Sequence, residues 1–124
     1  MRDNQETERV DFRVRTKESA LRVIRLFCAL PKRVEVDVIG KQVLRSGTSV
    51  GANFREAHRA RSDAEFLSKV GDCLKELEET CYWLELLVEG EIVPLNLLAA
   101  LQDECNQLIA ILTTISKKVK HRAK

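Results

Sequence analysis

Apolar residues recur at alternating steps of four and three through a stretch otherwise rich in small polar residues. The stretch covers residues 45–58 and reads RSGTSVGANFREAH. Side chains three and four residues apart share one face of an α-helix, so the pattern predicts a helix running to about Ala60. Each glycine weakens a helix by about 1 kcal/mol relative to alanine, so Gly47 and Gly51 predict close approach of a neighbouring helix. The repeating positions are Ile39, Val43, Gly47, Val50, Phe54 and Ala57.

Two further segments on either side have the same helical spacing. Residues 17–30 place Leu21, Ile24 and Cys28 on one stripe, with Val23, Phe27 and Leu30 beside it, and Pro31 predicts the end of that helix. Ser62 and Glu65 have the spacing of a capping box at the start of another helix, which ends near residue 90. The apolar stripe of that helix consists of Phe66, Val70, Cys73, Leu77, Cys81 or Thr80, Leu84 and Val88.

A last helix is predicted from Pro94 onward, with a heptad stripe of apolar residues. Four amphipathic helices with short connections predict an all-α, antiparallel up-and-down four-helix bundle. We expect one domain over residues 1–124, with a basic N-terminal arm at about 1–16 and a basic C-terminal tail at about 117–124. The stripe of the last helix consists of Leu98, Leu101, Cys105, Leu108, Leu112, Ile115 and Val119.

Composition excludes several classes of protein. Apolar residues make up 44% and charged residues 32% of the chain, which is typical of a globular domain. No apolar run approaches the roughly 20 residues that a membrane-spanning helix needs, and the N-terminus alternates acids and bases, so we expect a cytoplasmic protein. The four cysteines form no C-x-x-C pair and accompany only two histidines, which predicts buried thiols and no metal or other cofactor.

The sequence contains no recognisable catalytic site. A phosphate-binding loop needs Gly, four residues and then Gly-Lys, but Gly47 and Gly51 are separated by three residues and no lysine follows. Glu56 and His58 are two residues apart, so on a helix their side chains diverge by about 200°. We therefore predict that the protein is not an enzyme.

One broad polar stripe on the second predicted helix is a candidate interface. It is either an ion-paired solvent face, in which Glu56 pairs with Arg59, or a polar seam inside the bundle or between subunits, in which Ser49 or Asn53 bonds to a neighbouring helix. Tyr82 and Trp83 are adjacent, so one ring is expected at the bundle edge or in an interface between subunits. The stripe consists of Arg45, Ser49, Asn53, Glu56 and Arg59.

Basic residues gather near both ends of the chain, whereas residues 63–91 carry nine acids against two bases. If the first and last helices are antiparallel, the two groups form one basic pole, which either binds nucleic-acid backbone or only aids solubility. The candidates near the start are Arg13, Arg15, Lys17, Arg22 and Arg25. Those near the end are Lys117, Lys118, Lys120, Arg122 and Lys124.

Three segments within residues 45–83 carry a resemblance to a known family. They read RSGTSVGANFREA, RSDAEF and KELEETCYW. Their pattern resembles the small bacterial proteins encoded in 23S ribosomal RNA intervening sequences, although Phe54 stands where Ile is usual and His58 where small residues are common. The matching positions are Arg45, Ser46, Ser49, Val50, Asn53, Glu56, Ala57, Ser62, Glu65, Phe66, Lys75, Glu76, Glu79, Tyr82 and Trp83.

The resemblance implies a four-helix bundle that assembles into a homopentamer and has no enzymatic activity. In fold, the family is also similar to the accessory variability determinants of diversity-generating retroelements, which are basic pentamers that bind nucleic acid and a reverse transcriptase. By that analogy we expect a homo-oligomeric adaptor that binds RNA or DNA, with a protein partner such as a reverse transcriptase. The alternative is a structural oligomer that recruits a protein without binding nucleic acid.

Overall fold

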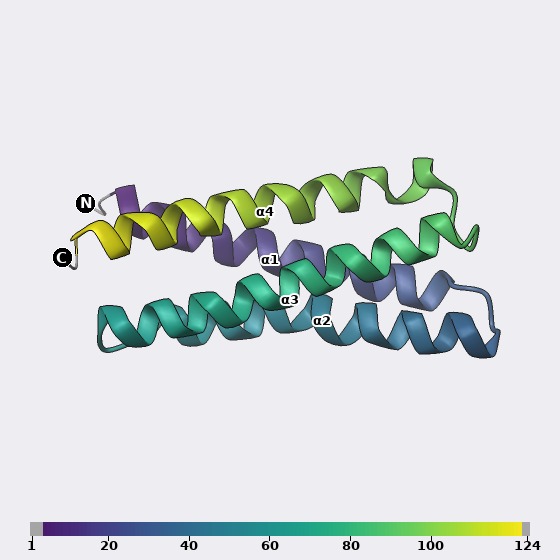
Figure 1. The fold of residues 1–124 in the computed structure, drawn as a ribbon, viewed down its shortest axis with the longest axis horizontal. Coiled ribbons are helices and arrows are strands. Elements are labelled where there is room, and N and C mark those ends of the chain that lie inside the picture. Colours follow the sequence, from purple (N-terminus) through teal and green to yellow (C-terminus); the bar gives the residue numbers. More distant parts are fainter. Residues whose placement is uncertain (1–3, 123–124) are drawn as a thin grey trace.

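The computed structural model describes residues 4–122, which form four α-helices joined by short turns (Figure 1). Helix α1 spans Asn4–Ala29, α2 spans Val34–His58, α3 spans Asp63–Glu89 and α4 spans Leu95–Arg122. Successive helices lie side by side and run antiparallel, and residues 4–122 contain no strand. The predicted all-α, up-and-down four-helix bundle is confirmed.

Helix α1 begins earlier than the sequence pattern indicated. Residues 4–16 were expected to form a basic arm, but they continue α1, whereas residues 1–3 lie outside the described part of the chain. Phe12 explains the early start, because its side chain is buried and its ring centroid lies 4.5 Å from that of Phe54 on α2. The N-terminal half of α1 thus contributes to the core.

The predicted buried face of α1 was wrong. Leu21 and Ile24 are 42% and 41% exposed, and Cys28 is exposed as well. The buried face instead carries Phe12, Thr16, Ser19 and Val23. Two of these four residues are hydroxyl-bearing, so apolar spacing alone pointed to another face of the helix. That second apolar face is left exposed along α1.

Small residues on α2 explain why α1 buries small side chains. A Cβ atom on Gly47 would lie 2.9 Å from Val23 Cγ2, and one on Gly51 would lie 3.2 Å from Thr16 Oγ1. Both distances are shorter than ordinary van der Waals contact between carbon and a neighbouring heavy atom. The glycines therefore lie within continuous helix, and close packing of a neighbouring helix against them is confirmed.

The core consists of two clusters along the bundle. The stripe predicted for α4 is buried in full, and on α3 Thr80 is the buried one of the two alternatives, whereas Leu87 takes the buried position that was assigned to Val88. One cluster contains Phe12, Val50, Phe54, Ala57, Phe66, Val70, Cys73, Leu77, Leu108, Leu112, Ile115 and Val119. The other contains Val23, Val43, Leu84, Leu87, Val93, Leu98, Leu101 and Cys105.

The turn between α2 and α3 is held by the predicted cap. Ser62 Oγ accepts a hydrogen bond of 3.1 Å from the backbone N–H of Glu65, as a capping box requires. The Glu65 carboxylate does not return to Ser62, however, and accepts from the backbone N–H of Arg61 at 3.4 Å. The turn consists of residues 59–62, and it lies at the same end of the bundle as the start of α1 (Figure 1).

Candidate nucleic-acid interface

Four helix ends meet at one end of the bundle: the start of α1, the end of α2, the start of α3 and the end of α4 (Figure 1). Lys118 Nζ lies 3.1 Å from a carboxylate oxygen of Glu8, and Arg122 Nη2 lies 3.1 Å from Asp63 Oδ1. These two ion pairs tie the end of α4 to the starts of α1 and α3. We call this region the basic end, and its bases are Arg9, Arg13, Arg55, Arg59, Arg61, Lys117, Lys118, Lys120 and Arg122.

The start of α1 and the end of α4 come together as predicted, but some of the bases are engaged by acids. Besides Lys118 and Arg122, Arg15 is paired: its Nε lies 3.1 Å from Glu104 Oε2, and its Nη2 also contacts Glu104 and Gln107. The hydrogen bond to Glu104 raises the pKa of Arg15. Lys17 is exposed. Lys124 lies outside the described residues.

Arg22 and Arg25 lie away from the basic end. They line an open hollow of about 460 Å³ together with Pro31 and Pro94, which belong to the α1–α2 and α3–α4 connections at the opposite end. The rise of 1.5 Å per residue separates Arg25 from Arg13 by about 18 Å along α1. The basic residues near the start of the sequence are thus divided between the two ends of the bundle.

Three arginines at the end of α2 and in the following turn were not assigned to the basic pole from the sequence. Arg55, Arg59 and Arg61 are exposed, and within residues 4–122 no carboxylate forms an ion pair with them. Lys117 and Lys120 are also exposed and without such a partner in that range. Antiparallel topology was the available signal, because it returns the α2–α3 turn to the end where the chain starts.

A half-buried histidine lies among these bases. His58 Nδ1 and Arg13 Nε are buried and make no hydrogen bond within the described residues. Burial lowers the pKa of His58, and the positive charges of Arg13, Arg9 and Arg59 lower it further, against the opposing charge of Glu6. The neutral imidazole is therefore favoured over the imidazolium.

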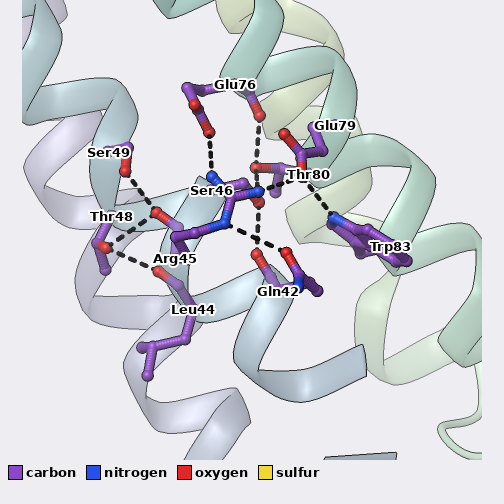
Figure 2. Close-up of polar contacts among 10 residues, drawn as sticks. All are labelled: Gln42, Leu44, Arg45, Ser46, Thr48, Ser49, Glu76, Glu79, Thr80 and Trp83. Carbon is purple, nitrogen blue, oxygen red and sulfur yellow. Dashed lines mark hydrogen bonds and ion pairs between the residues drawn. The ribbon is translucent and has the colours of Figure 1, made fainter. Parts of the chain in front are cut away.

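The polar stripe on α2 is partly an interhelical seam (Figure 2). Arg45 Nη1 lies 3.2 Å from Glu76 Oε2 on α3, and its Nη2 contacts Glu79. Beneath this pair, Thr80 and Ser46 hydroxyl oxygens are buried and 2.8 Å apart. The seam thus joins two of the sequence segments that carried the family resemblance.

Other members of the stripe behave differently from the prediction. Glu56 pairs with Lys69 Nζ on α3 at 2.8 Å and not with Arg59. Ser49 Oγ donates to the Arg45 carbonyl of its own helix at 2.6 Å. Asn53 is half-buried, and its side chain makes no hydrogen bond to any residue in the described range. Of these three residues, only Glu56 bonds to α3, and its partner there is not the one that local spacing suggested.

Tyr82 and Trp83 divide between surface and core edge. Tyr82 is 53% exposed, which agrees with the expectation that one ring lies at an edge. Trp83 packs beside the second core cluster, and its Nε1–H donates to Glu79 Oε1 at 3.2 Å (Figure 2). Their ring centroids lie 5.1 Å apart in an edge-on arrangement.

The described residues show no arrangement of side chains suited to holding a metal, since no three or more His, Cys, Asp or Glu side chains gather there. All four cysteines are free thiols, of which Cys73 and Cys105 are buried. In the same range, no helix has the length and apolar character needed to cross a bilayer.

The fold and this surface define a small four-helix-bundle protein with a basic end and an interhelical polar seam. Residues 8–114 match the model of the 23S rRNA-intervening sequence protein family, and the chain belongs to that family. A crystal structure of a protein of unknown function from the S23 ribosomal protein family of Bacteroides thetaiotaomicron is similar, with 36% identity and a TM-score of 0.83. The match covers 89% of this chain and 98% of that one, and no curated protein matches.

Proposed function

We propose that the protein is a non-enzymatic, cytoplasmic, homo-oligomeric adaptor that binds nucleic-acid backbone through its basic end. The observation that carries this proposal is the group of five exposed bases without ion pairs in the described chain. They come from the end of α2, the α2–α3 turn and the end of α4. They are Arg55, Arg59, Arg61, Lys117 and Lys120.

Such a surface is suited to binding the phosphate groups of a nucleic acid and not its nucleobases. Arginine and lysine side chains neutralise phosphates and release counterions, so binding depends steeply on salt and little on sequence. Tyr82, the most exposed aromatic among the described residues, lies on the middle of α3 and away from the basic end, so stacking on single-stranded bases is not part of the proposal.

Oligomerisation is supported by the second apolar face of α1. Val14 is 52% exposed, and Leu21 and Ile24 lie on the same helix with similar exposure. Exposed apolar side chains aligned along one helix are typical of an interface. We propose five copies in a ring, as the family resemblance implies, so that five basic ends act together on one phosphate backbone.

The test is fluorescence anisotropy with a structured ribosomal RNA hairpin and a DNA duplex at salt concentrations from about 50 to 200 mM. Arg59→Gln combined with Arg61→Gln should weaken binding and lower the salt slope by about 2, because each phosphate contact contributes about 0.9. Arg22→Gln combined with Arg25→Gln removes the same charge at the opposite end and should change neither. Equal effects of the two double variants, or micromolar binding absent at low salt, would contradict the proposal.

The alternative function is a structural oligomer that recruits a protein, such as a reverse transcriptase, without binding nucleic acid. The exposed Tyr82 beside the Arg45 seam favours this alternative, because aromatic and arginine side chains are enriched at protein interfaces. Alanine at Lys117, Lys118, Lys120 and Arg122 would then leave the set of co-purified proteins unchanged, whereas Tyr82→Ala would deplete it.

A further inference from the structure

The packing of α1 on α2 can be followed from residue to residue toward the basic end. Val23 faces Gly47, Thr16 faces Gly51, and the Phe12 ring lies 4.5 Å from the Phe54 ring. In an antiparallel pair, moving toward the start of α1 also moves toward the end of α2. Arg9 lies about one turn before Phe12, Arg13 directly follows Phe12, and His58 lies about one turn after Phe54, so Arg9 and Arg13 come close enough to act on His58.

Arg9 also reaches the neighbouring helix α3. Its guanidinium carbon lies 4.1 Å from the ring centroid of Phe66, in the first turn of α3. A cation over an aromatic face is held electrostatically, so this contact positions Arg9 beside the α2–α3 turn. Arg9, Arg13, His58 and Arg59 therefore surround one junction of three helices.

This junction has more hydrogen-bond donors and positive charge than the chain satisfies. Arg13 Nε is a permanent donor that is buried, and neither it nor the buried His58 Nδ1 has a hydrogen-bond partner among residues 4–122. An unpaired buried donor is destabilising, and more so when it is charged. The charged groups around His58 are Arg9, Arg13 and Glu6 on α1 and Arg59 after α2, so cations outnumber acids three to one.

We propose that Arg13 and His58, flanked by Arg9 and Arg59, form a phosphate subsite of the basic end, and that phosphate binding there is coupled to protonation of His58. The assignment of the phosphate to a nucleic-acid backbone rests on the proposed function. The subsite itself rests on the two orphaned nitrogens and on the register that places them together.

The coupling follows from charge. Without a bound anion, a proton on the imidazole meets three guanidinium groups against the single carboxylate of Glu6 and finds no acceptor at Nδ1 among the described residues, so the neutral form is favoured. A bound phosphate supplies an acceptor oxygen and a negative charge, both of which favour the imidazolium. The protein then takes up one proton from solvent as it binds, and affinity rises as the pH falls.

The first arm of the test measures RNA affinity at about pH 7.5 and about pH 5.5 at constant salt, a range in which histidine is the main titrating side chain. Full coupling strengthens binding by at most about tenfold per pH unit. We expect the wild-type protein to gain at least about threefold more affinity than His58→Gln between these pH values. His121→Gln is the matched control, because His121 is the second histidine and is exposed at the end of α4; it should retain the pH dependence.

The second arm measures the effect of an anion on the pKa of His58 in the absence of RNA. In His121→Gln, the imidazole proton resonances report on His58 alone, and titration in sodium sulfate is compared with titration in sodium chloride at equal ionic strength. Sulfate is a tetrahedral oxyanion that does not itself titrate in this range. We expect it to raise the pKa of His58 in this protein and to have no such effect once Arg13→Gln is added.

The two arms separate the two proposals. RNA binding with the same pH dependence in wild-type and His58→Gln protein overturns the subsite and leaves the proposed function intact. If RNA binds at neither pH, the proposed function fails and sulfate alone decides: a raised pKa of His58 supports the subsite, and an unchanged one overturns it. Circular dichroism and thermal melting of each variant exclude unfolding as the cause.

Discussion

Val23 on α1 occupies the space that a side chain at Gly47 on α2 would fill. A Cβ atom on Gly47 would lie 2.9 Å from Val23 Cγ2 and 3.3 Å from Val23 Cβ. Valine is branched at Cβ and has restricted χ1 rotation, so it cannot simply turn away. The small residue thus fixes the distance between the two helices within one chain.

Gly47→Ala is expected to destabilise the protein by about 1–3 kcal/mol, because overpacking against Val23 outweighs the better helix propensity of alanine. Gly71→Ala is the matched control on α3, where a Cβ would meet nothing within 4 Å. That change should stabilise the protein by up to about 1 kcal/mol. Urea denaturation measures the free energy of unfolding of both variants. Equal changes of the same sign in the two variants would contradict the close packing of Val23 against Gly47. Gly47→Leu should cost more than Gly47→Ala.

The buried hydroxyl pair between α2 and α3 should contribute measurably to stability. Ser46 Oγ donates to the Gln42 carbonyl at 2.8 Å and accepts from Thr80 Oγ1. Thr80→Val keeps the shape but removes the donor, so it should lower the free energy of unfolding by about 1 kcal/mol. Thr114→Val removes an exposed hydroxyl on α4 with the same change of helix propensity and should lower it by less. Chemical denaturation that ranks the two variants in the reverse order would refute this assignment.

Arg45 and Glu79 should be energetically coupled, and Trp83 can report it. A double-mutant cycle of Arg45→Ala and Glu79→Ala is expected to give a coupling free energy of about 0.5–1 kcal/mol. The value is small because the pair is partly exposed and screened by solvent. Since Trp83 is the single tryptophan and donates to Glu79, Glu79→Ala should also shift its fluorescence emission. Zero coupling together with unchanged emission would show that the seam is not formed in solution.

The four thiols should differ widely in reactivity. Cys28 is exposed, whereas burial raises the pKa of Cys73 to about 12, and a hydrogen bond to Cys81 together with burial raises the pKa of Cys105. Since the thiolate is the nucleophile and the hydrogen bond from Cys105 lowers the pKa of the half-buried Cys81, iodoacetamide near pH 8 should label Cys28 and Cys81 and leave Cys73 and Cys105 unmodified in the native protein. Peptide mass spectrometry gives the order, and denatured protein, in which all four sites should react, is the control. Labelling of Cys73 as fast as Cys28 would mean that α3 is not packed as described.

Stability should depend on pH through His58. Burial and then the charge of Arg13 lower its pKa in the folded state, so the unfolded chain binds more protons between that pKa and the ordinary value of about 6.5. The free energy of unfolding should therefore fall as the pH is lowered from about 6.5 through the folded-state pKa, and level off below it. Urea unfolding of His58→Gln should show a flatter profile in this window. A profile identical to that of the wild type would contradict the lowered pKa.

The sequence predicted most of the fold, because helical periodicity in α2, α3 and α4 coincides with apolar burial. It failed on α1, where Thr16 and Ser19 lie on the buried face and Leu21 and Ile24 on the exposed one. A pattern based on hydrophobicity cannot identify a face that is buried through small hydroxyl residues against glycine. Only the register with Gly47 and Gly51 determines which face of α1 is inside.

The candidate site was predictable only in part. Antiparallel topology indicated that the start of α1 meets the end of α4, and the Lys118–Glu8 ion pair confirms this. Which bases remain unpaired depends on acids from other helices, such as Glu104 beside Arg15. Sequence spacing along one helix cannot supply those partners, which also explains why Glu56 pairs with Lys69 and not with Arg59.

The seam formed by Arg45 with Glu76 and Glu79 has an evolutionary consequence. One guanidinium holds two carboxylates that stand 31 and 34 positions further along the chain. Substitution of the arginine alone would leave two neighbouring carboxylates that repel each other. Substitution of both acids would leave the guanidinium without these two ion pairs. We therefore expect the three positions to change together among descendants of a common ancestor, even though they belong to separate blocks of sequence.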